Sequence, residues 1–261
     1  MMKQLPSRPL QVARRDIVDG LVTGIEVITA FNDENARLTP TLLAARIGIS
    51  RSAARRYLLT LVHTGMVATD AREFWLTPKV LTLGRAYLDS ARLPRALLPY
   101  LQRLTAQVQE STNYSVLDGH EVVYLSRVNA PRHLNPGFDP GTRLPAYAST
   151  AGRVLLAALP DDQLQHYLDR VELLPFTNMT VIDREVLRCE LMAIREHGFG
   201  VTENQFEMGM RGISVPLKSR RGVLIGALSV STMVSSGSRA EVTGRCLPAL
   251  QATANTLMLW L

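Results

Sequence analysis

The sequence predicts an α+β protein of two domains joined by a helical segment. Within the first 80 residues, capping residues and glycines delimit short amphipathic helices, and a small hairpin follows them. Residues 79–108 carry leucines at helical spacing, and from Tyr114 strand-like runs alternate with helices, as in α+β domains. The expected parts are a flexible arm at 1–15, a first domain at 16–78, a helical linker or interface at 79–110 and a second domain at 111–261.

Composition excludes several classes of protein. The 261 residues are 46% hydrophobic and 20% charged, which suits a globular protein with two buried cores. No apolar stretch approaches the ~20 residues that cross a bilayer, and residues 1–15 lack the apolar segment of a secretory signal. Cys189 and Cys246 lie far apart without zinc-ligand spacing. We therefore expect free, buried thiols, a reducing cytoplasm and no membrane partner.

Positive charge is concentrated towards the start of the chain. The net charge is +6, and residues 1–80 hold 11 Lys and Arg against 7 Asp and Glu, whereas the rest holds 18 against 16. A basic domain favours a polyanion as its partner, and nucleic acid is one candidate.

A first helix is expected over residues 17–31. Leu21, Ile25 and Ile28 repeat at the spacing of a helix that turns one apolar stripe to a core. We therefore expect these three side chains to be buried.

Two further helices match a helix-turn-helix. Thr39 and Pro40 form a favourable cap and first turn for one helix, which ends at Gly48. Ser50 then caps another helix over residues 51–63. Two short helices joined across a glycine are the pattern of this motif.

A small β-hairpin is expected after the helices. Residues 66–68 and 73–76 are short apolar runs, and 69–72 have the composition of a turn between them. The hairpin completes a winged helix-turn-helix over residues 16–78.

The third helix has three arginines and no acidic residue, which suits the recognition helix of a DNA-binding motif. At 100° per residue its expected buried face consists of Ala54, Leu58, Leu61 and Val62. The predicted DNA contacts, taken from the caps, the outer face and the hairpin tip, are Thr39, Ser50, Arg51, Ser52, Ala53, Arg55, Arg56 and Arg72. Two alternatives stay open: a merely solvated basic face, or a motif that acts through protein contacts alone.

The linker carries an apolar seam whose spacing of 4, 3 and 4 residues resembles a coiled-coil repeat. Such a seam packs either on the chain's own sheet or on a second subunit, and the sequence leaves both possibilities open. Pro94 and Pro99 mark a joint within this segment. The seam consists of Leu97, Leu101, Leu104 and Val108.

The second domain is predicted as a mixture of strands and helices. Asp118 and Gly119 signal a hairpin between its first two strands. Residues 130–145, rich in Pro and Gly, are expected to form a loop. The expected strands lie at 114–117, 121–127, 199–203, 212–217 and 223–231, and the expected helices at 150–159, 161–171, 183–197 and 239–261.

Several long motifs resemble the IclR family of bacterial transcription regulators over about residues 17–260. The matching segments are 24–31, 49–58, 144–157, 206–216 and 226–231. Residues 53–61, 74–84 and 141–147 resemble its Pca/Pob branch, which controls the breakdown of aromatic acids.

The resemblance implies a GAF-like effector-binding domain after the winged helix-turn-helix and the linker. It implies a homodimer or dimer of dimers that binds double-stranded promoter DNA and a small carboxylate effector. The implied function is a cytoplasmic transcription regulator of aromatic catabolism, with RNA polymerase as a further candidate contact.

The effector site is expected where a loop enters a helix at Thr150, Ala151 and Gly152. Free N–H groups at a helix start suit a carboxylate. Ser229 and Ser231 alternate on one strand and therefore share a face, which is either a pocket or solvent-exposed. Together with the positions that the resemblance nominates, the candidates are His133, Leu144, Thr150, Ala151, Gly152, Thr202, Met210, Gly212, Ser229 and Ser231.

Two departures from the Pca/Pob pattern leave the identity of the acid open. Ala151 stands where that branch usually carries Met, and the prolyl loop at 131–136 also differs. Both changes could enlarge the cavity. A regulator of another pathway with a non-aromatic acid is therefore an alternative.

An enzyme is disfavoured by the absence of catalytic motifs. The chain has no Gly-x-Ser-x-Gly, no Cys/His pairing and no phosphate loop. We expect no cofactor and no metal, because no His lies at ligand spacing from Glu203 or Glu207. Arg143 and Arg153 are expected at the surface or at an interface. A small-molecule enzyme on a GAF-like fold stays a remote alternative.

Overall fold

The computed structural model describes residues 12–130 and 138–261. The chain divides between Ala86 and Tyr87 into two compact units, which are described separately below. The division falls inside α4 (Leu81–Ser90), within the segment expected to be the linker.

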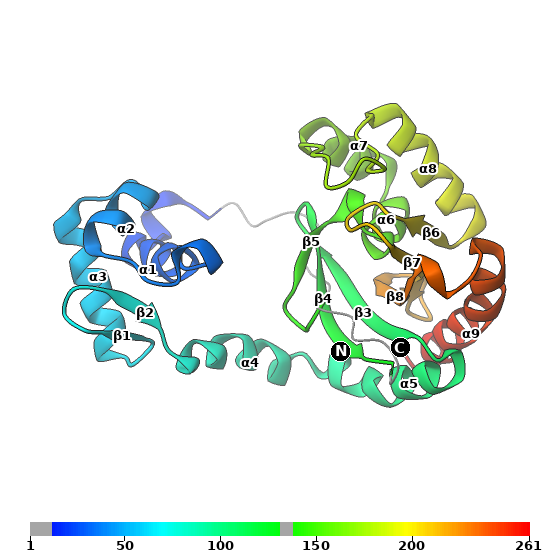
Figure 1. Cartoon of the computed structure of the whole chain (residues 1–261), viewed down its shortest axis with the longest axis horizontal. Helices are drawn as coiled ribbons and strands as arrows, with labels where there is room; N and C mark the ends of the chain where they lie inside the picture. The colour runs from blue at the N-terminus through cyan, green and yellow to red at the C-terminus, as the bar shows by residue number, and fades with distance from the viewer. Residues whose placement is uncertain (1–11, 131–137) are drawn as a thin grey trace. The chain divides into compact units, whose positions relative to one another are not determined.

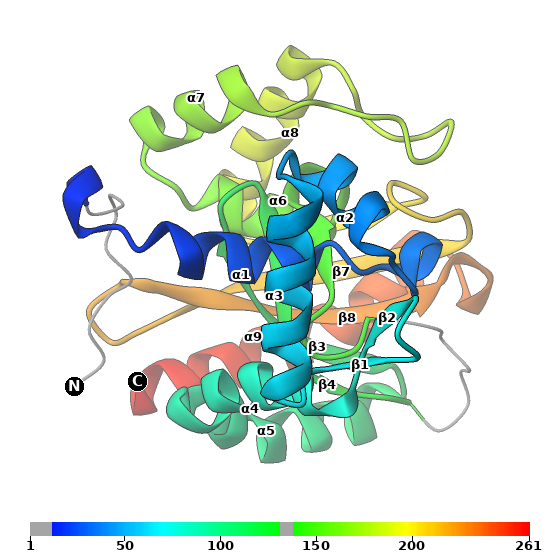
Figure 2. The ribbon, with the colours of Figure 1, turned by 90° about the vertical axis from the view of Figure 1, so that its left-hand side faces the viewer.

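The first unit is a small helical domain with a two-stranded hairpin (Figures 1 and 2). The hairpin strands pair antiparallel, with Val67 opposite Leu76. The elements are η1 (Arg14–Asp16), α1 (Asp19–Thr29), η2 (Asp33–Asn35), α2 (Pro40–Ile47), α3 (Arg51–His63), β1 (Val67–Thr69), β2 (Phe74–Leu76) and η3 (Pro78–Val80). The predicted order of elements is present, with bounds within two residues of those expected.

The expected core stripe of α1 is wrong. Leu21 and Ile25 are 65% and 55% exposed, and Val27 and Ala30 are buried instead, against Leu43, Leu58 and Phe74 among others. The helix carries apolar side chains on more than one face, so periodicity alone did not identify the face that packs on α2 and α3.

The second unit is a six-stranded antiparallel sheet with helices on both faces (Figure 1). The strand order is β5-β4-β3-β8-β7-β6. The strands are β3 (Ser111–Asp118), β4 (Glu121–Val128), β5 (Arg143–Pro145), β6 (Gly200–Glu203), β7 (Met210–Lys218) and β8 (Leu224–Met233). The helical elements are α5 (Arg92–Val108), η4 (Ala146–Ala148), α6 (Thr150–Ala157), α7 (Asp161–Arg170), α8 (Arg184–His197), η5 (Val234–Ser236) and α9 (Arg239–Trp260).

The apolar seam of the linker packs on the chain's own sheet. Its residues, which lie on α5, belong to one buried cluster with Ile213 and Val215 of β7 and Leu250 of α9. The break between the helices falls at Ala91, where the backbone leaves the helical region, rather than at the prolines. Pro94 is tolerated because it lies in the first turn of α5.

The opposite face of the sheet is covered by α6. Ala151, Val154 and Leu155 pack with Val122 and Ala227 of the sheet. This helix lies so close to β7 that a Cβ on Gly212 would fall 2.0 Å from Thr150 Oγ1, so the position requires glycine. The helix that begins the expected effector segment is therefore seated directly on the sheet.

Two expectations for this unit need correction. The segment 130–145 contains the short strand β5, which pairs with β4. Cys189 is exposed on α8, whereas Cys246 is buried as expected, because α8 turns Leu187 and Leu191 rather than Cys189 to the core. Among residues 12–130 and 138–261, none of the helices combines the length and the hydrophobicity of a membrane-spanning segment.

Candidate nucleic-acid interface and candidate ligand pocket

The helix-turn-helix is built by two side-chain caps and a glycine. Thr39 Oγ1 accepts a hydrogen bond from the N–H of Leu42 at 3.3 Å, and Ser50 Oγ accepts one from the N–H of Ala53 at 3.2 Å. Gly48 between the helices has φ 71°, a left-handed conformation that favours glycine. Both predicted caps are present, and they fix where α2 and α3 begin.

The helix α3 has one buried and one exposed face. Ala54 and Leu58 lie fully in the core, and the opposite face is open. Within the described residues, its three arginines form no salt bridge, so their charge is available. Of the predicted contacts, Thr39 and Ala53 are half-buried, and the exposed ones are Ser50, Arg51, Ser52, Arg55, Arg56 and Arg72.

The hairpin tip is held by Asp70. Its Oδ1 accepts hydrogen bonds from the N–H groups of Glu73 and Arg72 at 2.8 and 3.0 Å, which lower the pKa of this carboxyl group. Sequence reasoning missed Arg37, whose guanidinium lies 4.1 Å above the Trp75 ring and is 3.7 Å from the carboxylate of Asp70. These contacts support the turn from which Arg72 projects.

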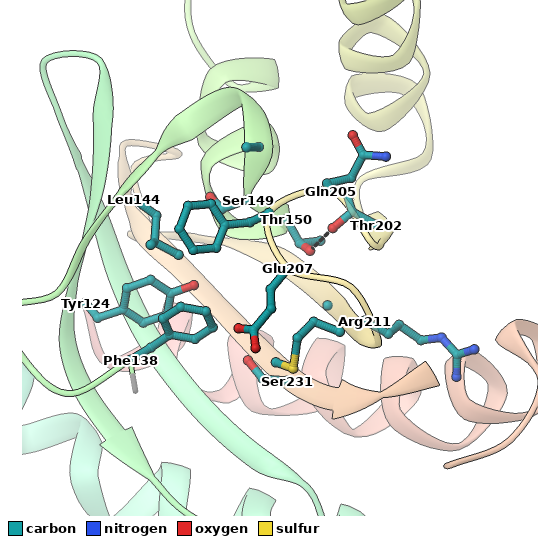
Figure 3. A pocket seen from close by; sticks show the side chains of 14 residues that line it. Tyr124, Phe138, Leu144, Ser149, Thr150, Thr202, Gln205, Glu207, Arg211 and Ser231 are labelled. Carbon is teal, nitrogen blue, oxygen red and sulfur yellow. Dashed lines mark hydrogen bonds between the residues drawn. The ribbon is translucent and has the colours of Figure 1, made fainter. Parts of the chain in front are cut away.

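A pocket opens over the sheet beside the start of α6 (Figure 3). Its volume is about 50 Å³, less than the ~150 Å³ of a cavity known to hold benzene. It is lined by Tyr124, Phe138, Leu144, Ala148, Ser149, Thr150, Thr202, Gln205, Phe206, Glu207, Met210, Arg211, Gly212 and Ser231.

Six of the predicted effector residues meet in this pocket, although they come from separate parts of the chain. They are Leu144, Thr150, Thr202, Met210, Gly212 and Ser231. The hydroxyl groups of Thr150 and Thr202 are hydrogen-bonded to each other, which links the start of α6 to β6 (Figure 3).

The other four candidates lie elsewhere. Ala151 is buried in the apolar cluster under α6, and Gly152 donates its N–H to Ser149 Oγ at 3.0 Å. Ser229 is buried, and its Oγ atom is hydrogen-bonded to Ser214 Oγ at 2.9 Å. His133 lies outside the described residues.

Aromatic side chains form one wall of the pocket, and sequence reasoning missed them. The rings of Tyr124 and Phe138 stack with centroids 5.3 Å apart and 17° between planes. Phe206 lies edge-on to Phe138 at 6.2 Å. Burial raises the pKa of Tyr124 to about 12, so its hydroxyl, which points towards the space in Figure 3, stays protonated near neutral pH.

Two arginines beside the pocket are buried. The expectation that Arg153 lies at the surface or at an interface is wrong, since only 2% of it is exposed and its partners belong to the same unit. Its guanidinium donates to Tyr147 O and Gln205 Oε1, both at 2.5 Å, and pairs with Glu190. These partners compensate the burial, which itself lowers the pKa of Arg153.

Arg211 is held in a similar way and lines the pocket. It donates to Glu203 Oε1 at 2.5 Å and to Gly237 O at 2.9 Å. Arg143, by contrast, is exposed and pairs with Glu121 at 2.6 Å. No cluster of three potential metal ligands occurs in the described part of the chain.

A helix-turn-helix with an open basic face, on a chain that also carries a pocket-bearing domain, defines the class of ligand-responsive DNA-binding regulators. Family models agree along the chain. The IclR helix-turn-helix domain matches residues 20–71, and the bacterial transcriptional regulator IclR C-terminal domain matches residues 85–258. The chain belongs to the IclR family of transcription regulators.

Individual proteins and solved structures are similar to this chain over most of its length or over its second unit. The Pca regulon regulatory protein of Pseudomonas putida is 38% identical over 93% of this chain and 84% of its own length. A crystal structure from Rhodococcus sp. RHA1 is 39% identical, covers 93% of this chain and 97% of its own, and has a TM-score of 0.81. A double mutant of the inducer-binding domain of PobR from Acinetobacter, solved with 3-hydroxybenzoic acid, is 28% identical, covers 64% of this chain and 98% of its own, and has a TM-score of 0.61.

These findings confirm the resemblance, the fold class and the regulator function that the sequence predicted. The family's members are transcription regulators, so the expectation that the chain is not an enzyme is also confirmed.

Proposed function

We propose that this regulator reads promoter DNA through the exposed face of α3 and responds to a small aromatic acid bound in the pocket beside α6. The binding of an aromatic acid is supported by one observation: the aromatic wall of the pocket lies next to hydroxyl groups at the start of α6.

The DNA half rests on geometry and charge. Arg51, Arg55 and Arg56 are all exposed in the first half of α3, close to the end that enters a major groove in helix-turn-helix complexes. Arginine can bind guanine through two hydrogen bonds, and the exposed Ser50 and Ser52 hydroxyls suit phosphate oxygens. Arg72 at the hairpin tip would add a contact to the backbone or the minor groove.

The effector half rests on complementary surfaces. Tyr124, Phe138 and Phe206 offer ring faces and edges to an aromatic molecule. Thr150 and Ser149 place hydroxyl groups at the start of α6, where the helix dipole favours a carboxylate. The 3-hydroxybenzoic acid bound to the PobR double mutant supports an aromatic acid over a purely aliphatic one.

The small volume of the cavity implies that side chains move when an acid binds. Met210 and Phe206 line the pocket next to the turn 204–209 and are only half-buried. Their movement would couple binding to the conformation of the unit, which is how an effector shifts a population of states. The consequence for transcription would be a change in operator affinity or in contact with RNA polymerase.

We also propose a homodimer, or a dimer of dimers, as the DNA-binding form. Two recognition helices related by a two-fold axis read the two halves of a palindromic site. The exposed apolar face of α1 and its preceding turn, formed by Ile17, Val18, Leu21, Val22 and Ile25, supports this proposal because it would be covered in such an assembly.

The test measures the melting temperature of the full chain with hydroxylated benzoates and with aliphatic dicarboxylates. Gel-shift assays then measure its binding to a DNA fragment that carries the promoter next to its own gene. We expect hydroxylated benzoates to raise the melting temperature and to change the affinity for the promoter fragment. Stabilisation by an aliphatic dicarboxylate alone would contradict the aromatic assignment, and no salt-dependent duplex binding would contradict the DNA assignment.

A further inference from the structure

The sheet under the pocket carries polar side chains on the face that α6 covers. Asn113 of β3 is in register with Arg127 of β4 on one side and with Ser229 of β8 on the other. The three side chains therefore stand side by side on one face of the sheet. Asn113 Nδ2 donates to the hydroxyl of Ser231, which lines the pocket, at 2.9 Å.

Asn113 and Arg127 have buried polar atoms without a hydrogen-bond partner in the described part of the chain. Asn113 is 0% exposed, and its Oδ1 atom has no donor. Nη1 and Nη2 of Arg127 are buried and have no acceptor, although Nε donates to Asn129 Oδ1 at 2.5 Å. Burial lowers the pKa of this guanidinium, and the nearby Tyr124 and Asp139 only partly oppose the effect.

Such atoms destabilise the fold. An unsatisfied buried polar group costs about 1–3 kcal/mol, and more when it is charged. An apolar pair at these two positions would avoid that cost, so packing does not explain the residues. Unpaired groups of this kind point to a partner that binds from outside the fold.

Both residues lie directly behind side chains that line the pocket. Asn113 is bonded to Ser231, and the Arg127 guanidinium carbon lies 6.0 Å from the centre of the Phe138 ring. An aromatic acid needs a larger cavity than the present one, and growth towards β3 and β4 would uncover these polar atoms.

We propose that Asn113 and Arg127 form a second polar end of the effector site and bind a hydroxyl group on the ring, away from the carboxylate. This inference rests on the proposed function. A hydroxyl group both donates and accepts, so it can donate to Asn113 Oδ1 and accept from Arg127 Nη1 or Nη2. A carboxylate only accepts and would leave Asn113 unsatisfied.

The sheet sets the distance between the two ends. The start of α6 lies over Gly212 of β7, and Asn113 lies on β3, two strands away. Strand spacing makes this separation about 10 Å between backbones, before side chains reach inward. The preferred hydroxyl therefore lies across the ring from the carboxylate, and the effector class is a 4-hydroxylated benzoic acid rather than benzoate or its 2-hydroxy isomer.

The test is calorimetric titration of the full chain with benzoate, 2-hydroxybenzoate, 4-hydroxybenzoate and adipate. We expect the 4-hydroxy acid to bind at least tenfold more tightly than the first two. In Arg127→Met this advantage falls to about twofold, while the affinity for benzoate changes little. Arg143→Met removes an exposed arginine of the neighbouring strand β5 and should preserve the advantage. Arg127→Gln repeats the measurement if the Met variant is poorly soluble.

The melting temperature without ligand separates a binding role from a structural one. Because Arg127 is desolvated and incompletely paired, Arg127→Met should melt at the same temperature or higher. The inference is overturned if Arg127→Met melts at a clearly lower temperature, or if this variant loses as much affinity for benzoate as for 4-hydroxybenzoate. It is also overturned if the wild-type protein binds benzoate and 4-hydroxybenzoate equally well. Each of these results would leave the proposed function standing. Binding of adipate that is lost in Arg127→Met would also overturn the inference, because Arg127 would then bind a carboxylate rather than a hydroxyl group. If none of the acids binds, the proposed function fails as well.

Discussion

Thr150 at the start of α6 is hydrogen-bonded through its hydroxyl to that of Thr202 on β6. Gly212 lies beneath this contact, so close that a side chain there would collide with Thr150. This wall of the pocket is thus built from a helix start, a strand at the edge of the sheet and a glycine that allows their close approach.

Gly212→Ala should disrupt this arrangement. The added methyl group would meet Thr150 Oγ1 at 2.0 Å, so α6 or β7 has to shift. We expect a loss of about 1–3 kcal/mol in stability and a much weaker response to acids. Circular-dichroism melting with and without 4-hydroxybenzoate measures both. Gly244→Ala, an exposed helical site with open space around it, is the control and should be neutral or stabilising. Equal behaviour of the two variants would refute the packing argument.

Arg153→Ala should destabilise the second unit through lost hydrogen bonds. The change leaves Tyr147 O without its donor and Glu190 without its cationic partner, whereas Gln205 Oε1 keeps the hydrogen bond from the N–H of Val181 at 3.0 Å. Since an unsatisfied buried acceptor costs about 1–3 kcal/mol, we expect a loss of about 2 kcal/mol or more in urea unfolding. The control is Arg143→Ala, an exposed ion-pair residue whose loss should cost about 1 kcal/mol or less. A smaller effect at Arg153 than at Arg143 would contradict this reading.

Local rules made much of the first unit predictable. The caps at Thr39 and Ser50 and the glycine at 48 act within a few residues, so they could be identified without the fold. The wrong stripe on α1 shows the limit: its apolar residues occupy several faces, and only the partners on α2 and α3 select one.

The pocket was less predictable because its parts meet only through the sheet. Tyr124 and Phe138 stack, yet Phe206 reaches them from a turn far along the chain. No local pattern reports such a meeting. Arg153 is similar, since its burial depends on Glu190 and Gln205, which lie 37 and 52 residues further along the chain.

Glu207→Gln should strengthen acid binding. Among the described residues, this exposed carboxylate is the one acidic group that lines the pocket, and it repels an anionic ligand. Charges a few ångströms apart in a water-like medium interact by about 1 kcal/mol, so we expect a gain of about threefold to tenfold in affinity by calorimetry. Glu196→Gln on the exposed side of α8 should have no effect. Unchanged or weaker acid binding by the Glu207→Gln variant would show that the carboxylate hydrogen-bonds the ligand.

Tyr124 makes stability depend on alkaline pH. Its pKa is about 12 in the folded protein and about 10 when unfolded, so unfolding releases a proton between these values. The protonated Tyr124 therefore makes its full contribution to the free energy of unfolding below pH 10. This contribution falls by about 1.4 kcal/mol per pH unit as the pH rises from 10 towards 12. Urea unfolding of Tyr124→Phe should therefore depend less steeply on pH in this range. Some slope should persist, because burial also raises the pKa of Tyr114 and Tyr167. Identical slopes would mean that Tyr124 is solvated in solution.

Arg56→Ala should reduce specific DNA binding more than nonspecific binding. Arg56 is exposed on the side of α3 opposite the buried Ala54 and Leu58, where a base edge would lie. Loss of a bidentate contact to guanine costs about 1–3 kcal/mol, whereas a lost phosphate contact weakens all sequences alike. Fluorescence anisotropy on the operator and on a scrambled duplex, over a range of salt, separates the two. Arg220→Ala removes an equally exposed charge from the other unit and should leave both affinities unchanged. If Arg56→Ala lowers both affinities equally and reduces the salt slope by about one, Arg56 contacts only the backbone, and base recognition falls to Arg51 or Arg55.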